Sequence, residues 1–428
     1  MKPRIMWASD STFLPTGFSN QTMQILRELS KNYECLEWSH QYGGNELVQL
    51  TQHGIQQPIE PWVHLPAAYS SYGQGQIEQS IKRFTPSIVA WLCDSFMLTQ
   101  AQAHAGPRND WVIHLINKLK NEGNQTKFLH YYPLDSEDIY QGVAEELAVM
   151  DYRVAMSKFA RDFVKKETGL DSHYIPHCCD TYNYQPLAQE ERDKIKASAG
   201  LAGKFVIGSV GRNQSRKMPN RMAYVMKEFC KDKKDVVLLM HCDPMDPQAG
   251  VNTPEIISSC GFKPKSILQY VDGRGNEIRF TGVSWSNGFP ANKVNEIYNA
   301  MDVHTMCTTG EGFGITTIEA MACGIPNVVT DYTTTRELLL DDGECGIPAP
   351  YNNFINGGLN TKRALIDSQA FAAALQRYYD SESLRKKHGQ MGREKAVAFY
   401  SQQVVLPQWT KLFAEIMEAE EGVKLRCE

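Results

Sequence analysis

The feature that most constrains the fold is a buried strand that runs into a glycine turn and then a helix, and it occurs twice. RIMWAS (Arg4–Ser9) leads through DSTFLPTGFSN to Gln21–Leu29, where Met23, Leu26 and Leu29 have helical spacing. The stretch KFVIGSVGR repeats this opening about half-way along the chain. Strands that alternate with helix-length segments predict parallel sheets joined by crossover helices.

Further strand candidates follow each start. In the first series they are ECLEWS, SIVAWLC (Ser87–Cys93), KFLHYY (Lys127–Tyr132) and YRVAMS (Tyr152–Ser157). In the second series they are DVVLLMHC, IRFTG, DVHTMC and NVVTD. A chain of 428 residues exceeds what one core usually supports, so we expect two α/β domains of similar build. Ligands of such domains bind at the carboxyl ends of the strands, which predicts a site in a cleft between them.

Two segments lie outside this rhythm. Tyr42–Gln76 is rich in Gln, Gly and Pro, and we interpret it as an irregular insertion at the edge of the cleft. The tail from Asp367 is expected to be helical because its apolar residues have mostly helical spacing. These residues are Val404, Leu406, Trp409, Leu412, Phe413 and Ile416.

Composition and charge narrow the function. The 44 basic and 49 acidic residues give a formal net charge of −5, which offers no general attraction to nucleic acid or anionic lipid. The sequence shows no run of 18 apolar residues and no secretory signal, and its 11 cysteines follow no repeated spacing. We therefore expect a cytoplasmic protein with free thiols.

One group of residues could ligate zinc. His177, Cys178 and Cys179 are consecutive, and His173 lies nearby. A zinc site normally needs a second, distant pair of ligands, and adjacent cysteines are a poor zinc pattern. We favour buried thiols in a loop, and we expect no metal site.

The stretch GRNQSRK directly follows the strand Phe205–Val210 and carries three cations. Arg212 and Lys217 are five positions apart, with Arg216 between them. Cations in a glycine turn at the carboxyl end of a parallel strand suit a phosphate or diphosphate, because Arg binds in bidentate fashion and Lys adds a compact charge. A solvated basic loop is the alternative.

A second stretch, GEGFGITTIEAMACGIP, follows the strand DVHTMC. Gly310, Gly312 and Gly314 allow backbone N–H groups to approach a ligand, and a helix expected to begin near Ile315 offers its positive end to an anion. Glu311 lies in the loop and Glu319 inside the helix, so the two carboxylates need not share a face. They suit acceptors for sugar and ribose hydroxyls better than the paired carboxylates of a glycoside hydrolase.

These motifs resemble those of glycosyltransferase family 4, which are retaining enzymes of the GT-B fold. The family's Glu-x7-Glu motif, EGFGxxxxEAMACGxPVV, is matched from Glu311 to Glu319 and onward as AMACGIPNVV. Its GRxxxxKG loop is matched by Gly211, Arg212 and Lys217, with Met218 in place of the last Gly.

Weaker matches extend the resemblance along the chain. They are SKFARDF (Ser157–Phe163), IPHCCDTYNYQP (Ile175–Pro186), IRFTG (Ile278–Gly282), AMDVHTMCT (Ala300–Thr308) and TTTREL (Thr333–Leu338). The resemblance implies two Rossmann-like domains, residues 1–180 for the acceptor and 181–400 for the donor. It also implies that a helix at 401–428 packs back on the first domain.

The resemblance also implies roles for individual residues. Arg212 and Lys217 would bind the donor diphosphate and stabilise its growing charge. Glu311 would hold the donor sugar and Glu319 the nucleotide ribose. The backbone of the glycine loop would assist, and Gly282 belongs to the FTG turn. The loop residues are Gly312, Phe313, Gly314 and Ile315.

In the first domain, the resemblance implies that the turn at Gly17 and Phe18 faces the donor phosphates or the acceptor. Asp135, after the strand KFLHYY, is our first candidate for a residue beside the reacting sugar, and Asp94 is the second. His130 lies within the strand and is expected to be a packed histidine. Asp is also common in turns and helix caps, which is the alternative for both carboxylates.

The predicted function is a hexosyltransferase that moves a sugar from a UDP-, GDP- or ADP-sugar to a hydroxyl of a glycan or small molecule. It would retain the anomeric configuration and need no metal or other cofactor, and the acidic clusters DPMD and DSED are not assigned to the diphosphate site. The alternatives are a transferase acting on modified DNA bases, a hydrolase or phosphorylase of the same fold, and a nucleotide-sugar binder without activity. The donor base, the acceptor and the oligomeric state stay open.

Overall fold

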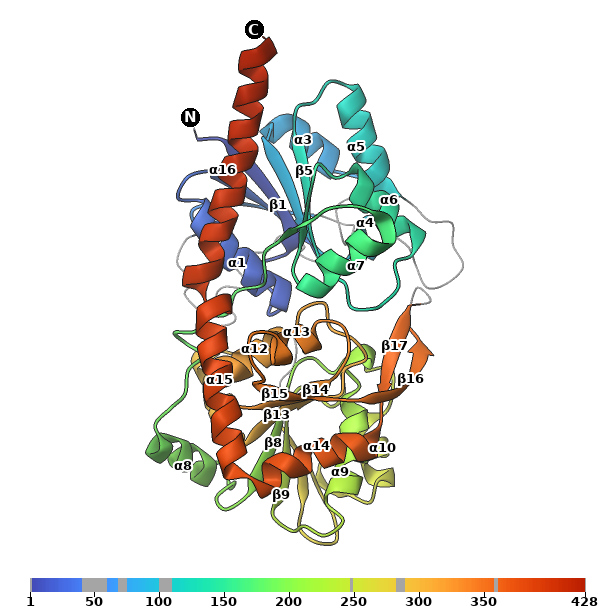
Figure 1. Ribbon diagram of the computed structural model, residues 1–428, viewed down its shortest axis with the longest axis vertical. Helices are drawn as coiled ribbons and strands as arrows, with labels where there is room; N and C mark the ends of the chain where they lie inside the picture. Colours follow the sequence, from blue (N-terminus) through green and yellow to red (C-terminus); the bar gives the residue numbers. More distant parts are fainter. Residues whose placement is uncertain are drawn as a thin grey trace. The chain divides into compact units, whose positions relative to one another are not determined.

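The computed structural model describes residues 2–40, 60–67, 75–99, 110–246, 249–281, 289–357 and 361–427. The chain forms two compact units (Figure 1). The first consists chiefly of Met1–Cys178 and Gln402–Glu428, and the second of Cys179–Gly357 and Lys362–Ser401.

The first unit is built around a parallel sheet. Within the described residues, its strands have the order β3-β2-β1-β4-β5-β6-β7. The strands are β1 (Arg4–Asp10), β2 (Glu34–His40), β3 (Val63–Pro66), β4 (Ile88–Leu92), β5 (Lys127–Tyr132), β6 (Tyr152–Ala155) and β7 (His173–Tyr174). The helices are α1 (Gly17–Leu29), α3 (Ile77–Phe84), α4 (Ser95–Thr99), α5 (Trp111–Asn121), α6 (Gln141–Val149), α7 (Lys158–Thr168) and α16 (Gln402–Cys427).

Helices cover both faces of this sheet, with α1 and α16 on one side and α5 on the other (Figure 1). Successive side chains of a strand point to opposite faces, so the central residues of β1, Ile5–Ala8, are apolar on both faces. Met6 belongs to a buried cluster with residues of α3 and α5, whereas Trp7 meets Trp409 of α16 edge-on, with ring centroids 5.5 Å apart. In the tail, α16 confirms the predicted helical character, and within it Val405 is buried whereas Val404 is exposed.

The second unit contains a mixed sheet of order β10-β11-β12-β9-β8-β13-β14-β15 among the described residues, and a hairpin, β16-β17. The strands are β8 (Phe205–Val210), β9 (Val236–His241), β10 (Lys263–Ser266), β11 (Gln269–Val271), β12 (Glu277–Phe280), β13 (Val303–Met306), β14 (Asn327–Thr330), β15 (Gly346–Ala349), β16 (Tyr351–Asn356) and β17 (Lys362–Ile366). The helices are α8 (Gln189–Ser198), η1 (Ser215–Lys217), α9 (Pro219–Phe229), α10 (Thr253–Ser259), α11 (Ala291–Asn299), α12 (Ile315–Ala322), α13 (Thr335–Leu340), α14 (Ser368–Asp380) and α15 (Glu382–Tyr400).

All the strand candidates of the sequence are confirmed as β1, β2, β4, β5, β6, β8, β9, β12, β13 and β14. The sequence pattern did not predict β3, β7, β10, β11, β15, β16 and β17. Most are short or lack a continuous buried run, and every residue of β10 is exposed. Most of the supposed insertion at residues 42–76 lies outside the described residues. Its interpretation as irregular was wrong for Val63–Pro66, which pairs with β2 as an edge strand.

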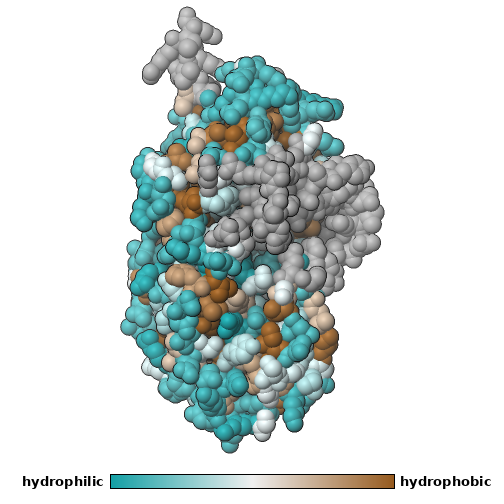
Figure 2. Space-filling model, turned by 90° about the vertical axis from the view of Figure 1, so that its right-hand side faces the viewer, coloured by the Kyte–Doolittle hydropathy of each residue, from teal (hydrophilic) through white to brown (hydrophobic). Residues whose placement is uncertain are grey.

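The face drawn in Figure 2 is mostly hydrophilic, and its hydrophobic residues form separate patches. No helix in the described part of the chain is long and apolar enough to cross a membrane.

Candidate functional site

The topology of the second unit brings two predicted segments together. Strand β8 pairs with β9 on one side and with β13 on the other, so the order of the strands reverses between β8 and β13. Open α/β sheets bind ligands at the carboxyl ends of the strands at such a point. GRNQSRK follows β8 and TTGEGFG follows β13, so the basic loop and the glycine loop lie at the expected position.

The two loops contact each other through Arg216, which the sequence did not single out. Its Nη1 donates to Oε1 of Glu311 at 3.0 Å and to the carbonyl oxygen of Gly310 at 3.1 Å. Burial would raise the pKa of Glu311, but the charges of Arg216 and Lys217 and a hydrogen bond with Thr308 outweigh it and lower the pKa. Glu311 is therefore a buried, ionised carboxylate.

Lys217 lies close to the backbone of its own loop. A Cβ atom on Gly211, whose φ is +145°, would lie 2.9 Å from Nζ of Lys217, so glycine is required for this approach. Burial lowers the pKa of Lys217, and Glu311 partly opposes that shift. Met218 has φ of 43° in the left-handed region, which explains why the resembling family usually has glycine there.

Arg212 has a carboxylate partner that the sequence did not suggest. Its Nε donates to Oδ2 of Asp246 at 2.7 Å, and Nη2 lies 3.4 Å from Oδ1. Asp246 is buried and belongs to the DPMD cluster after β9, which the sequence did not connect with this loop. This bidentate pair fixes the plane of the guanidinium group.

Glu319 has a different environment from Glu311. It lies in α12, and the hydroxyl of Tyr298 in α11 donates to its Oε2 at 2.7 Å. Burial raises the pKa of Glu319 to about 7, although hydrogen bonds from Tyr298 and Tyr184 and the charge of Lys217 lower it. Lys217 thus acts electrostatically on both Glu311 and Glu319. The two tyrosines were not identified from the sequence.

The glycine loop is held from the segment Thr333–Leu338. The N–H of Glu311 donates to Oγ1 of Thr333 at 3.1 Å, and Oγ1 of Thr334 donates to the carbonyl oxygen of Glu311 at 3.0 Å. Thr333 has φ of +52°, a strained conformation for a β-branched residue. Strain of this kind persists only where surrounding contacts maintain it, and it is typical of ligand-binding segments.

The loop ends at the start of α12. Gly314 is the N-cap of α12 and has φ of 99°. Because glycine has no side chain, no capping side chain of the N-cap residue accepts from the first N–H groups of the helix. Phe313 is buried, and its ring centroid lies 5.9 Å from that of Tyr400. Phe313 would therefore contact a ligand through its backbone, as Gly312 would. Gly282, the remaining predicted residue of this unit, lies outside the described residues.

In the first unit, the strand order reverses between β1 and β4. Gly17 begins α1, and the Thr16 side chain caps that helix by accepting from the N–H of Ser19 at 3.1 Å. Thr16 also donates to Oδ2 of Asp10, a buried residue at the end of β1, at 2.9 Å. Phe18 lies against the ring of His177, with centroids 6.2 Å apart.

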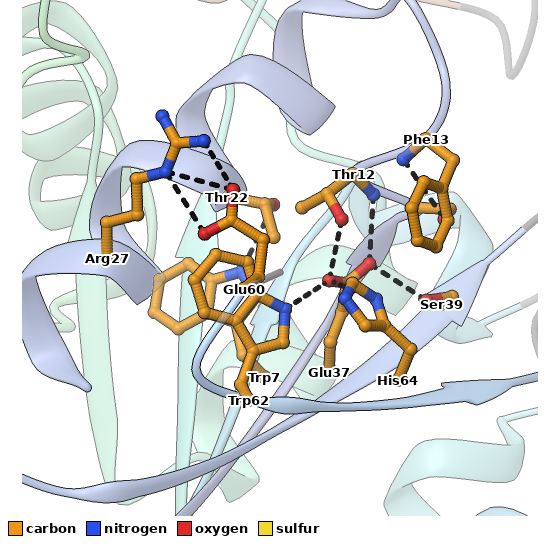
Figure 3. Close-up of polar contacts among 11 residues, drawn as sticks. Trp7, Thr12, Phe13, Thr22, Arg27, Glu37, Ser39, Glu60, Trp62 and His64 are labelled. Atoms are coloured by element: carbon orange, nitrogen blue, oxygen red, sulfur yellow. Dashed lines mark hydrogen bonds and ion pairs between the residues drawn. The ribbon is translucent and has the colours of Figure 1, made fainter. Parts of the chain in front are cut away.

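A buried carboxylate fixes the path from β1 to this turn (Figure 3). Glu37 accepts from the N–H and hydroxyl of Thr12 at 2.9 and 2.8 Å, from Ser39 at 2.8 Å and from Nε1 of Trp62 at 2.8 Å. Nδ1 of His64 lies 3.0 Å from the same carboxylate. Burial would raise the pKa of Glu37, and its contacts with His64, Thr12 and Ser39 reverse the shift and lower it. The cluster anchors the start of the β1–α1 loop.

The structure places the first unit's candidates at the same edge of the sheet. Asp94 comes two residues after β4, and Asp135 comes three residues after β5. His130 is confirmed as a packed histidine, because it is fully buried with Nδ1 2.9 Å from Glu146 Oε1 and Nε2 3.0 Å from the carbonyl oxygen of Cys93. Burial lowers its pKa, but the charge of Glu146 outweighs this, and the net shift is upward.

The residues considered as zinc ligands make other contacts. Cys178 and Cys179 are buried free thiols, as the sequence predicted. Nδ1 of His177 lies 2.7 Å from the hydroxyl of Tyr131, and burial lowers the pKa of His177 to about 3. In the parts of the chain that the structure describes, no three His, Cys, Asp or Glu side chains gather in a way that could hold a metal ion.

Two Rossmann-like units of this build, with a cationic loop and a glutamate-bearing glycine loop at a switch point, define the GT-B class of protein. Residues 205–381, which lie in the second unit, match the family described as glycosyl transferases group 1. The resemblance found in the sequence is thereby confirmed.

Individual relatives agree with this classification. The phosphatidyl-myo-inositol mannosyltransferase of Mycobacterium leprae is 31% identical over 275 residues, 64% of this chain and 61% of the relative. The alpha-maltose-1-phosphate synthase of Mycolicibacterium smegmatis is 24% identical over 277 residues, 62% of this chain and 63% of the relative. The matches thus span less than two thirds of the lengths of these curated relatives.

Solved structures show the fold over nearly the whole chain. The sucrose-phosphate synthase of Thermosynechococcus elongatus has a TM-score of 0.71 at 15% identity, covering 98% of this chain and 100% of that one. HepE of Anabaena, in complex with UDP and glucose, has a TM-score of 0.66 at 14% identity, covering 96% and 100%.

Proposed function

We propose that the protein is a retaining glycosyltransferase that moves a sugar from a nucleoside diphosphate sugar to an acceptor hydroxyl. The observation that carries the proposal is the meeting of Arg216, Lys217, Glu311 and Glu319 at the β8–β13 switch point. Cations there suit a diphosphate, and carboxylates beside them suit sugar hydroxyls. The complex of the related fold HepE with UDP-glucose supports this class of donor.

In the proposed reaction, Arg212, Lys217 and the N-terminus of α12 stabilise the charge that develops on the departing diphosphate. Glu311 accepts hydrogen bonds from the sugar and Glu319 from the ribose. The leaving phosphate takes the proton of the attacking acceptor hydroxyl on the same face, so no enzymic nucleophile is required. Asp94 and Asp135 remain candidates for contacts near the reacting sugar. The proposal requires neither a metal ion nor another cofactor.

We favour a glycan or small-molecule acceptor over DNA, because the chain carries a formal net charge of −5. A hydrolase or phosphorylase would use water or phosphate in place of the acceptor. A nucleotide-sugar binder without activity would release no diphosphate with any acceptor.

The test is product analysis with a sugar nucleotide, with and without acceptor, using NMR to assign the new anomeric linkage. We expect transfer with retention, and we expect Arg212→Ala and Glu311→Ala to lower kcat/KM by about a hundredfold or more while the fold is kept. Arg221→Ala, at an arginine of α9 that stacks on Tyr224, is the matched control and should retain activity. Near-normal turnover in both site variants, or inversion at the anomeric carbon, would contradict the proposal.

A further inference from the structure

Arg216 lies in the basic loop between Arg212 and Lys217, and the sequence analysis assigned no role to Arg216. The contacts of its side chain join the loop after β8 to the loop after β13, since one nitrogen, Nη1, donates both to the Glu311 carboxylate and to the Gly310 carbonyl oxygen. The side chain of Arg216 is 36% exposed, whereas that of Glu311 is 8% exposed. The pair therefore reaches from the protein surface to a nearly buried carboxylate.

The backbone of Arg216 makes the same connection. Its carbonyl oxygen accepts from the N–H of Thr309 at 2.8 Å and from Oγ1 of Thr309 at 3.0 Å. The N–H of Ala364 in β17 donates to the carbonyl oxygen of Thr309 at 3.0 Å. The glycine loop is thus supported at Thr309 both by Arg216 and by the β16-β17 hairpin.

Among the described residues, the charges that lower the pKa of Glu311 come from Arg216 and Lys217. Arg216 and Lys217 belong to the basic loop. Thr308, which follows β13 in the same segment as Glu311, forms a hydrogen bond with the Glu311 carboxylate. Without Arg216, the buried carboxylate would keep Lys217 alone of the two cations that lower its pKa among the described residues, and burial would favour its neutral form. A neutral carboxyl has lost part of its capacity to accept hydrogen bonds from hydroxyl groups.

We propose that Arg216 is a positioning residue that sets Glu311 to recognise the donor sugar. The inference rests on the proposed function, because it assigns to Glu311 the sugar of a nucleotide sugar. Arg216 acts through the carboxylate: it keeps Glu311 charged and fixes the direction of its oxygens. The competing role, a direct contact between Arg216 and the diphosphate, is separated by the test below.

The two roles differ in which ligand they affect. If Arg216 acts through Glu311, Arg216→Gln weakens binding of the nucleotide sugar by about tenfold or more and changes binding of the bare nucleoside diphosphate little, because only the former carries a sugar. If Arg216 binds phosphate directly, both affinities fall together. Isothermal titration calorimetry would measure both, with whichever of the UDP-, GDP- and ADP-sugars the wild-type protein binds and with the matching nucleoside diphosphate.

Four further variants complete the test. Arg216→Gln/Glu311→Gln should bind the nucleotide sugar no more weakly than Glu311→Gln alone, since the arginine has nothing left to position. Arg216→Lys keeps the charge without the planar fork and should recover part of the loss. Arg221→Gln is the matched control, and circular dichroism checks that each variant folds.

The pH profile gives a second readout. Loss of Arg216 should move the acid limb of kcat/KM to higher pH, because Glu311 then takes up a proton more readily, and raising the pH should recover activity. Equal losses for nucleotide sugar and nucleoside diphosphate, or additive losses in the double variant, would overturn the inference and leave the proposed function intact. Failure of the wild-type protein to bind any of the sugar nucleotides would overturn both.

Discussion

At the scale of single residues, two glutamates eight positions apart differ through their neighbours. The charges of Arg216 and Lys217 lower the pKa of Glu311 against the effect of burial, whereas burial raises the pKa of Glu319 to about 7 against the hydrogen bonds from Tyr298 and Tyr184. The sequence identifies both glutamates through their motif. It could not reveal how their ionisation differs, because Arg216 and Tyr298 come from separate segments that only the fold brings near.

The raised pKa of Glu319 predicts a pH-dependent stability. The folded protein binds this proton more tightly than the unfolded chain, so its stabilising effect is full below about pH 4.5 and is lost as the pH rises through about 7. Glu319→Gln mimics the protonated form and cannot titrate. From pH 5 to pH 8, the free energy of unfolding of wild type should therefore fall relative to that of Glu319→Gln by on the order of 2 kcal/mol.

Urea unfolding at several pH values measures this difference, with Glu190→Gln, at an exposed position in α8, as the control. A gap between Glu319→Gln and wild type that stays constant, or that narrows toward pH 8, would show that the carboxyl of Glu319 is not held in its neutral form.

At the scale of elements, the buried strands and the turns that follow them were predictable, because parallel strands between helix layers are apolar on both faces. The strands β10 and β16 were not, since their residues are largely exposed, and β11 and β17 were not, since they are short and lack a continuous buried run. Likewise, the sequence shows the glycines of the site loop but not the strained Thr333 that holds Glu311.

Gly314 tests the conformation of the site loop. Its φ of 99° is unfavourable for any residue with a Cβ, and an added Cβ would lie 3.1 Å from Cδ1 of Leu338. We expect Gly314→Ala to destabilise the protein by about 1–3 kcal/mol and to weaken donor binding, because the start of α12 must shift.

Gly273→Ala is the control, since a Cβ at Gly273 would meet nothing within 4 Å. Thermal unfolding measures the stability of both variants, and calorimetry measures their affinity for the donor. If Gly314→Ala matches Gly273→Ala in stability and affinity, the loop does not need its left-handed residue.

At the scale of the whole molecule, two α/β units followed from the repeated strand, glycine turn and helix, and the GT-B class followed from the resemblance of the motifs to glycosyltransferase family 4. The donor-side residues could be named because their motif is contiguous in the sequence. The first-unit candidates Asp94 and Asp135 rest on single residues after strands, and the Glu37 cluster escaped notice because it joins β2, the β1–α1 loop and β3. Contacts between distant segments carry no local sequence signal.

The central claim is that the second unit holds a nucleoside diphosphate sugar at Arg212, Lys217, Glu311 and Glu319. The most direct measurement is a thermal-shift comparison of UDP-, GDP- and ADP-sugars on the wild-type protein and on Lys217→Ala. A ligand that binds only the folded state at a hundred times its Kd stabilises it by about 2.7 kcal/mol. We predict that at least one sugar nucleotide raises the melting temperature of the wild-type protein and that Lys217→Ala largely abolishes the shift. No shift with any sugar nucleotide, or an equal shift in the variant, would contradict the claim.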